Sequence, residues 1–315
     1  MRSMRSFQRR TKYMLLLVTC LGTTVLVLMC MDTPLVITTC DRCFISRFRY
    51  LQNNSQICEE DNKSDTVDVL FLIFTVHGNQ KARDAIRETW MAVAKQNRAN
   101  IRYTFLLGEL ADSGDGEQMK AVLGENNRYH DIIIGNFTDS YRNLTFKTLM
   151  GLHWAVHFCS NAKTVVKTDD DMFIHVPNLL NSVSDNKEYI NTSMLGYCFP
   201  MMAPLRNSSS KWYTSIEQYP FSQFPRFCSG TCYVTGIDMI KQILAISVNV
   251  PFFYLEDVYI GMCLKVLNLE VTHVDGFKHD ANLDDICDFK NTDVISFHGL
   301  DPELLRSLWN TNCIS

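Results

Sequence analysis

The sequence predicts an α/β fold with a mixed, mainly parallel β-sheet. Nearly continuous apolar runs, typical of strands buried on both faces, occur at 67–76 (VDVLFLIFTV), 101–108 and 131–137. Segments with helical spacing at 83–96 and 144–159 alternate with these runs. The chain of 315 residues is 46% apolar and 20% charged, which suits one or two globular domains with a sizeable core.

The N-terminus predicts a membrane anchor. Residues 1–12 carry five basic side chains and no acidic one, and residues 13–31 carry no charge. As a helix rising 1.5 Å per residue, 13–31 would reach about 28 Å, close to the thickness of a bilayer core. The positive flank predicts that 1–12 stays cytosolic and that the chain after 31 crosses the membrane, as in a type II protein. A cleaved signal peptide is the alternative, although its apolar region is usually shorter.

Sequons and cysteines agree with a lumenal address. Ten of the 12 cysteines follow the anchor, and in an oxidising compartment they are expected to form disulfides. The net charge of −4 does not favour nucleic acid as a partner. Six N-glycosylation sequons occur, at Asn53, Asn62, Asn136, Asn143, Asn191 and Asn207.

A stem is expected at 32–66, because this stretch mixes Thr, Asn, Ser and acidic residues without sustained periodicity. The motif CDRC at 40–43 has the spacing of a redox or zinc site. It has no second C-x-x-C and no βαβ context, so a stem disulfide or free thiols are favoured.

The alternation of strands and helices continues through the expected domain at 67–315. An apolar strand is expected at 163–168, and further strands and helices at 230–244, 254–267, 269–274, 293–300 and 301–309. No linker in 67–315 demands a second fold. In sheets of this kind, ligands bind beyond the carboxyl ends of the strands.

Three consecutive carboxylates, Asp169, Asp170 and Asp171, follow the strand at 163–168 and precede an apolar Met-Phe-Ile. Like charges placed together repel unless a cation or a proton relieves them. Mg²⁺ and Mn²⁺ are commonly shared between one or two carboxylates and a substrate's phosphates. The triplet is therefore interpreted as a D-x-D metal site for a phosphorylated ligand, although an isolated D-x-D also occurs in many surface loops.

A second acidic pair, Glu256 and Asp257, also lies among apolar residues (FYLEDVYIG, 253–261). One interpretation is that these acids begin a helix, because acids favour the first turn. Alternatively, a carboxylate apart from the metal site could serve as the general base for a hydroxyl that attacks a phosphate-linked carbon.

Seven ordered blocks resemble the motifs of the β1,3-glycosyltransferase family, which includes β1,3-galactosyltransferases, β1,3-N-acetylglucosaminyltransferases and, more distantly, the Fringe enzymes. The resemblance covers roughly 67–310. The blocks are RDAIRETW (83–90), FLLG (105–108), DIIIGNFTDSYRNLTFKT (131–148), KTDDDMFI (167–174), YPFSQFPRFCSGTCYV (219–234), LEDVYIGMC (255–263) and FHGLDPELLRSLW (297–309).

The resemblance implies a GT-A fold in the Golgi lumen and an inverting transfer from a UDP-sugar with Mn²⁺ or Mg²⁺. Asp169 and Asp171 would form the D-x-D, with Asp171 coordinating the metal directly and Asp170 facing the nucleotide sugar. His298 matches the family's C-terminal histidine and is a candidate metal ligand, although a single histidine is often structural.

The same resemblance suggests roles for the acidic pair. Asp257 would be the general base, which takes the proton of the acceptor hydroxyl while its oxygen attacks the anomeric carbon from the face opposite UDP. Glu256 is the fallback base, or it orients the acceptor or the loop.

Several further residues are weaker candidates. Arg83 and Arg87 lie one helical turn apart and could hold phosphate, support the nucleotide pocket or form a solvated helix face. Lys147 and Lys167 are substrate-binding candidates of the same kind. Trp90 is expected in the core.

The segment CSGTCYV is expected to form a glycine-containing loop near the sugar, with Cys228 and Cys232 as disulfide partners. Many relatives have a glycine where this chain has Cys232, and this departure puts the donor sugar in doubt.

The leading hypothesis is a β1,3-galactosyltransferase of the Golgi that uses UDP-galactose and a glycan acceptor in protein or lipid glycosylation. A β1,3-N-acetylglucosaminyltransferase that uses UDP-GlcNAc is the alternative. A catalytically silent lectin or chaperone and a metal-dependent nucleotide hydrolase are the hypotheses from other classes, and hydrolysis of UDP-sugar without an acceptor would favour the last.

Overall fold

The computed structural model describes residues 37–44, 47–59, 67–95, 100–111, 116–279, 287 and 293–312. The chain divides into two units, Met1–Val36 and Ile37–Ser315, and every described residue belongs to the second. The anchor expected at 13–31 lies outside the described residues. Among the residues that the structure describes, no helix is long and apolar enough to cross a membrane.

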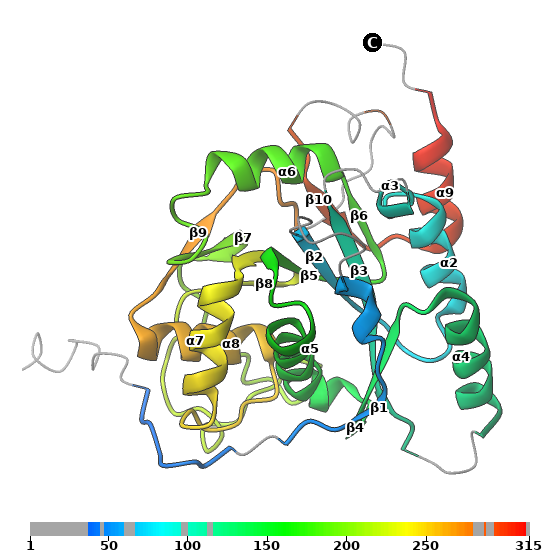
Figure 1. The fold of residues 1–315 in the computed structure, drawn as a ribbon. Coiled ribbons are helices and arrows are strands. Elements are labelled where there is room, and N and C mark those ends of the chain that lie inside the picture. Colours follow the sequence, from blue (N-terminus) through cyan, green and yellow to red (C-terminus); the bar gives the residue numbers. More distant parts are fainter. Residues whose placement is uncertain are drawn as a thin grey trace, which may run out of the picture. The chain divides into compact units, whose positions relative to one another are not determined.

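An eight-stranded mixed sheet forms the centre of this unit, in the order β1-β4-β3-β2-β5-β8-β7-β9 (Figure 1). The four strands β4, β3, β2 and β5 run parallel, whereas β8 is antiparallel to both of its neighbours. The strands are β1 (Tyr50–Gln52), β2 (Val67–Phe74), β3 (Ile101–Glu109), β4 (Ile132–Thr138), β5 (Ala162–Asp169), β7 (Ser193–Phe199), β8 (Phe227–Gly236) and β9 (Glu270–His273). A mixed, mainly parallel sheet is therefore confirmed.

A second, two-stranded sheet pairs β6 (Met172–Ile174) with β10 (Ser296–His298) in antiparallel register. The helices are α2 (Gln80–Glu88), α3 (Ala92–Lys95), α4 (Gly116–Tyr129), α5 (Leu144–Phe158), α6 (Val176–Asp185), α7 (Ile237–Ser247), α8 (Glu256–Leu267) and α9 (Pro302–Asn310). Short 3₁₀ turns occupy Ser55–Cys58 and Tyr141–Asn143.

Helices cover both faces of the sheet, which explains the continuous apolar runs. On one side of β2, the ring of Phe71 lies 5.7 Å from that of Trp90, which follows α2. On the other side, Leu72 lies close to Gly151 of α5, and α5 packs with α7 and α8. Because successive side chains of a strand point to opposite faces, a strand covered on both faces must be apolar throughout.

The helix expected at 83–96 is interrupted. α2 ends at Glu88 and α3 begins at Ala92, and the Thr89 hydroxyl donates to the Ala85 carbonyl 2.7 Å away. A threonine hydroxyl that bonds the preceding turn competes with helical hydrogen bonds. The break turns Trp90 into the core, where its Nε1 donates to the Met172 carbonyl at 3.0 Å, so the core position expected for Trp90 is confirmed.

Part of the expected stem packs onto the sheet and helices. β1 forms the edge strand beside β4, and the ring of Phe44 packs 5.8 Å from that of Tyr259 in α8. A disulfide joins Cys58 to Cys159 at the end of α5. Cys40 and Cys43 also form a disulfide, so CDRC is a disulfide and not a zinc site.

Candidate active site

The Asp triplet lies at the carboxyl edge of the parallel strands, as predicted. Asp169 is the last residue of β5 and pairs with Phe74, the last residue of β2. A cavity of about 490 Å³ opens at this edge. Its lining includes Thr75, His77, Asp139, Tyr141, Lys147 and Asp169–Asp171.

Asp170 is held by the loop that follows β2. Its Oδ2 accepts from Thr75 Oγ1 at 2.5 Å and from Asn79 Nδ2 at 3.0 Å. Burial raises the pKa of Asp170, while these two donors lower it. The Asp170 carboxylate is therefore fixed against the wall of the cavity by neutral donors.

Asp171 is the least satisfied of the three acids. Its Oδ1 is buried and has no hydrogen-bond partner, while its backbone carbonyl accepts from Gly299 and Leu300 at 3.0 Å each. Burial and the charge of Asp169 raise the pKa of Asp171, whereas His298 lowers it. A buried carboxylate oxygen without a partner is costly unless a proton or a cation joins it.

His298 is brought to the triplet by the small sheet, in which it pairs with Met172. Its Nδ1 lies 2.9 Å from the His279 carbonyl, so Nδ1 carries the proton and Nε2 is left as the acceptor nitrogen. A histidine whose second nitrogen is fixed by a carbonyl is the usual arrangement of a metal ligand.

The donor atoms near the triplet fit a divalent cation. Carboxylate oxygens of Asp169 and Asp171 and the imidazole Nε2 of His298 are ligands that suit Mn²⁺. Within the part of the chain that the structure describes, no three His, Cys, Asp or Glu side chains are grouped as a ready-made metal site. An open site of this kind would be completed by oxygens of a bound ligand.

Lys167 connects the two acidic groups. Its Nζ lies 2.7 Å from Asp169 Oδ1 and 3.2 Å from Glu256 Oε1, and it also donates to the Gly230 carbonyl. Burial lowers the pKa of Lys167, but the two carboxylates outweigh it and hold the ammonium charged. The sequence predicted Lys167 as a substrate-binding residue. In the structure Lys167 is 3% exposed, and its ammonium already binds these three protein groups.

Glu256 and Asp257 begin α8, as the helix-start interpretation predicts, and they also face β5 and β8. Glu256 Oε2 accepts from Thr148 Oγ1 at 2.9 Å and from the Tyr233 hydroxyl at 3.5 Å. Burial raises the pKa of Glu256 to about 7, Lys167 opposes this rise and Asp257 adds to it. Glu256 is therefore a buried carboxyl group: two hydroxyls hold its Oε2, while its Oε1 has the Lys167 ammonium at 3.2 Å and no hydrogen-bond partner.

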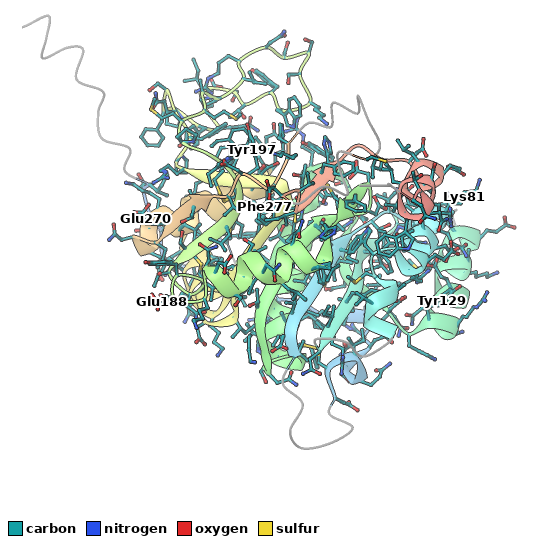
Figure 2. The ribbon with its side chains drawn as sticks, turned by 90° about the horizontal axis from the view of Figure 1, so that it is seen from above. Lys81, Tyr129, Glu188, Tyr197, Glu270 and Phe277 are labelled. Carbon is teal, nitrogen blue, oxygen red and sulfur yellow. A yellow bond between two sulfur atoms is a disulfide. The ribbon has the colours of Figure 1, made fainter. Side chains whose placement is uncertain are left out.

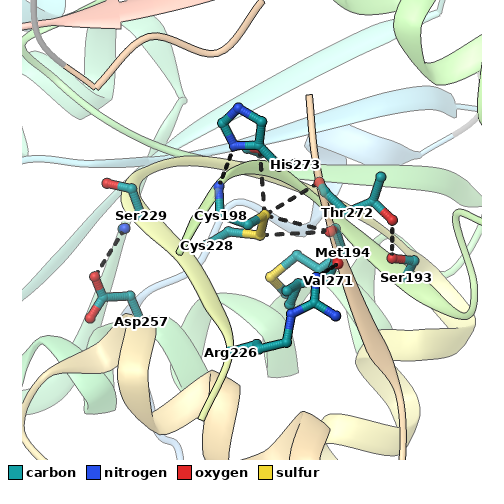
Figure 3. Close-up of a disulfide and its surroundings, with 12 residues drawn as sticks. Ser193, Met194, Cys198, Arg226, Cys228, Ser229, Asp257, Val271, Thr272 and His273 are labelled. Atoms are coloured by element: carbon teal, nitrogen blue, oxygen red, sulfur yellow. Dashed lines mark hydrogen bonds between the residues drawn. A yellow bond between two sulfur atoms is a disulfide. The ribbon is translucent and has the colours of Figure 1, made fainter. Parts of the chain in front are cut away.

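Asp257 is only partly buried, and backbone amides hold it. Its Oδ1 accepts from the Val258 amide at 2.8 Å. Its Oδ2 accepts from the Gly230 amide at 3.2 Å, the contact drawn as a dashed line from Asp257 in Figure 3. Burial raises the pKa of Asp257, and the two amides lower it. Of the two acids, Asp257 is the more exposed to solvent.

Gly230 is required where β8 passes the acidic pair. A Cβ at this position would lie 2.5 Å from Glu256 Oε1 and 3.5 Å from Asp257 Oδ2. The segment CSGTCYV is thus part of strand β8 and not the loop that the sequence predicted. The strand continues because it pairs with β5 on one side and with β7 on the other.

The two cysteines of β8 differ in bonding: Cys228 forms a disulfide and Cys232 does not. Cys228 is joined to Cys198 across β7 and β8, as Figure 3 shows. Cys232 is a buried free thiol opposite Thr168 of β5, so its predicted role as a disulfide partner is wrong. Burial raises the pKa of Cys232 to about 12, which keeps it protonated and unreactive.

Lys147 lines the cavity from α5. Its Nζ lies 2.8 Å from Asp139 Oδ1 and donates to the Thr75 carbonyl at 2.8 Å. Burial lowers its pKa, and Asp139 raises it. Lys147 therefore lines the cavity and connects α5 to Thr75, the residue after β2.

Arg83 and Arg87 lie behind the cavity wall and not in its lining. The Arg83 guanidinium donates to both oxygens of Glu125 at 2.9 and 2.7 Å and to the Val76 carbonyl at 2.7 Å. Arg87 donates to both oxygens of Asp131 at 2.8 Å. Both guanidiniums are buried, so the solvated helix face is wrong. The contact of Arg83 with the carbonyl of Val76, a lining residue, favours a supporting role beside the cavity.

Sequence reasoning missed several lining residues. Thr75 and His77 follow directly after the buried run of β2, so the rule that ligands bind at carboxyl strand ends could have found them. His77 Nε2 is buried without a hydrogen-bond partner. Tyr141 and Asp139 come from the turn before α5, and no local pattern marks them.

Comparison with known proteins identifies the family of this chain. Residues 81–275 match the family model described as Galactosyltransferase. Beta-1,3-galactosyltransferase 1 of Homo sapiens is 37% identical over 268 residues, which cover 84% of this chain and 78% of that protein. Beta-1,3-galactosyltransferase 2 of Homo sapiens is 35% identical over 267 residues, which cover 84% and 62% of the two chains.

Two solved structures that align with this chain are a bifunctional glycosyltransferase, WbbM, and a glycosyltransferase involved in glycosylation of the major capsid of PBCV-1. Each has a TM-score of 0.41, with 11% and 9% sequence identity. They cover 75% and 76% of this chain and 46% and 97% of their own chains.

The family model matches more than half of the chain, and the relatives share more than a third of their aligned residues with it. The same relatives support a nucleotide-sugar donor and a glycan acceptor. The chain therefore belongs to the β1,3-glycosyltransferase family, with a galactosyltransferase domain, and is a hexosyltransferase.

Proposed function

We propose that this protein is an inverting β1,3-galactosyltransferase that transfers galactose from UDP-galactose to a glycan acceptor. The observation that carries the proposal is the placement of two clusters of acidic residues at one edge of the sheet. Asp169–Asp171 line the cavity, and Glu256 and Asp257 lie on the far side of Lys167. The cluster Asp169–Asp171 suits a diphosphate with its cation, and the pair Glu256 and Asp257 suits an acceptor hydroxyl.

The cation that we propose is Mn²⁺ or Mg²⁺, held by Asp171, Asp169 and His298. When bound, it would supply positive charge to the diphosphate that leaves. The buried, unpartnered Oδ1 of Asp171 supports this assignment, because it is the oxygen that lacks a protein donor. Asp170, which Thr75 and Asn79 hold in place, would face the nucleotide sugar.

Asp257 is proposed as the general base. Its carboxylate would take the proton of the acceptor hydroxyl as that oxygen bonds to the anomeric carbon and the bond to UDP breaks. Attack from the face opposite UDP inverts the anomeric configuration. The amides of Val258 and Gly230 favour the charged form of Asp257, which a base requires.

Glu256 is proposed to position this base. It is buried between Thr148, Tyr233 and Lys167, and it cannot approach a substrate without giving up these contacts. The carboxyl group of Glu256, which lies next to Asp257, pairs with the charged Lys167. This pair holds the start of α8 against β5. Arg83 and Arg87 are also proposed to support the site, from behind the cavity wall, through their ion pairs with Glu125 and Asp131.

We also propose a GT-A fold and a Golgi address. The charge-free stretch at 13–31, the basic flank and the six sequons support a type II membrane protein whose domain lies in the lumen. The three disulfides with both cysteines described suit an oxidising compartment.

Sugar transfer by the detergent-solubilised full-length chain tests the proposal. The assay uses Mn²⁺, a panel of UDP-sugars, and acceptors that end in GlcNAc, GalNAc or Gal. Transfer from UDP-galactose that a chelator abolishes is the expected result. Preference for UDP-GlcNAc would assign the sister activity, hydrolysis without transfer would favour a hydrolase, and a folded protein that neither transfers nor binds UDP would favour a silent lectin or chaperone.

A further inference from the structure

The connection between β7 and β8, residues 200–226, carries several large apolar side chains that are exposed to solvent. Met201 is 68% exposed, Ile216 65% and Trp212 48%. Figure 2 shows this connection in yellow-green, standing out from the sheet beyond Tyr197. Apolar side chains that gather on one exposed segment often mark a ligand or partner site.

The connection, although it contains no helix or strand, is held in one conformation. The Arg206 guanidinium donates to four backbone carbonyls, those of Thr214, Ser215, Tyr219 and Phe221, at 2.8 to 2.9 Å. A side chain that satisfies four carbonyls fixes the path of the backbone between them. The exposed side chains are thus presented on a preorganised segment, which lowers the entropy cost of binding.

This segment is attached next to the proposed base. The Tyr254 hydroxyl donates to the Tyr213 carbonyl at 2.7 Å, and Tyr254 precedes Asp257 by three residues. The Arg142 guanidinium lies 4.0 Å from the centroid of the Tyr254 ring and connects the same place to the turn before α5. Trp212, the neighbour of Tyr213, is therefore held near the start of α8.

Tyr141 links this segment to the cavity. It interacts with the side chain of Trp212, it experiences the charge of Asp257, and it lines the cavity together with Asp169–Asp171. Tyr141 is itself 42% exposed. Tyr141 therefore connects the segment that carries Trp212 with the cavity that holds the Asp triplet.

The Trp212 ring already has one cation partner, because Lys211 Nζ lies 4.6 Å from its centroid. A pyranose ring has an apolar surface of C–H groups and a polar rim of hydroxyls. An exposed aromatic ring with a polar edge suits such a ligand, because apolar surface is buried while the hydroxyls stay hydrated.

We propose that Trp212 and Tyr141 form the acceptor subsite and that the acceptor pyranose stacks on Trp212 with its reacting hydroxyl toward Asp257. The inference rests on the proposed transferase function. The acceptor is the occupant that the site favours, because the donor's phosphates are assigned to the Asp triplet, which lines the cavity, and Trp212 is absent from that lining.

Tryptophan fluorescence tests the subsite without any turnover. The chain has four tryptophans, of which Trp90 and Trp154 are 0% exposed and Trp309 is 40% exposed. In Trp309→Phe, acrylamide should quench chiefly Trp212. Glycans that serve as acceptors in the transfer assay should reduce the quenching constant about twofold, because a stacked sugar shields the ring. Unchanged quenching at saturating acceptor would overturn the proposal.

Kinetics separate the subsite from the rest of the site. Trp212→Ala should raise the KM for the acceptor about tenfold and leave the KM for UDP-galactose unchanged. Trp212→Phe should recover most of the loss, and Trp309→Phe should behave as wild type. A folded Trp212→Ala protein with a normal acceptor KM would refute the subsite while the proposed function stood.

Failure of the proposed function has a different signature. If the wild-type chain transferred no sugar and bound no UDP, both proposals would fall. If it transferred sugar and Trp212 stayed open to acrylamide, only the subsite would fall.

Discussion

The ammonium of Lys167 lies 3.2 Å from the Glu256 carboxylate, and this ion pair connects the two acidic groups of the site. Lys167 belongs to β5 and Glu256 to α8, 89 residues later in the chain. The same ammonium holds Asp169 at 2.7 Å. One buried cation therefore bridges Asp169 of the proposed metal site and Glu256, the neighbour of the proposed base.

Lys167→Met should destabilise the fold by about 3–5 kcal/mol, because removing one partner leaves buried carboxylates without compensation. Urea unfolding measures the effect. Lys163→Met is the matched control on the same strand, since its pair with Asp68 is exposed and should contribute less than about 1 kcal/mol. Equal losses in the two variants would show that Lys167 has no special role.

Gly230→Ala should abolish transfer, because the new Cβ would lie 2.5 Å from Glu256 Oε1 and would displace the acidic pair. Transfer assays with the purified variant measure this. Gly124→Ala, in α4, is the control: its Cβ would meet nothing within 4 Å, and alanine should stabilise the helix by about 0.5–1 kcal/mol. Normal turnover in Gly230→Ala would argue against the proposed position of Glu256 and Asp257.

Asp257→Asn should lower kcat by about 10²- to 10⁴-fold, the usual contribution of a general base, while UDP binding is retained. Calorimetric titration with UDP and a transfer assay on one preparation measure both properties. If the variant turned over at a normal rate, Glu256 would become the candidate base.

Asp171→Ala should abolish metal-dependent binding of UDP, because the unpartnered Oδ1 is the oxygen assigned to the cation. Titration of UDP with and without Mn²⁺ measures the dependence. Asp275→Ala is a suitable control, since its side chain is 99% exposed. Wild-type binding by Asp171→Ala would remove the D-x-D assignment.

Glu256 should make the folded state more stable in mild acid. Burial raises its pKa from 4.5 to about 7, so the folded state binds its proton more tightly than the unfolded chain does. The contribution is complete below pH 4.5 and is lost as the pH rises to 7; at 1.36 kcal/mol per pKa unit it amounts to about 3 kcal/mol. Between pH 5 and pH 8, the free energy of unfolding of the wild type should fall relative to that of Glu256→Gln. Parallel curves would contradict the assignment.

The sequence by itself determined the class of the fold and the main acidic groups. The strands β2, β3, β4 and β5 are buried on both faces, and burial on both faces leaves a continuous apolar run that can be recognised without coordinates. The position of Asp169–Asp171 at the carboxyl end of β5 is confirmed, because the apolar run before them marks a buried strand. The helix start at Glu256 and Asp257 was visible for a similarly local reason.

Contacts between distant segments were decided only by the tertiary structure. The sequence offered Lys167 only as a weaker candidate than Arg83, yet Lys167 bridges the two acidic groups and Arg83 is buried with Glu125 behind the wall. Cys232 was expected in a disulfide, but Cys228 pairs with Cys198 because β7 lies beside β8. Local periodicity reports which face of an element is buried; it does not report which element buries it, and that pairing determines what each charge and each thiol meets.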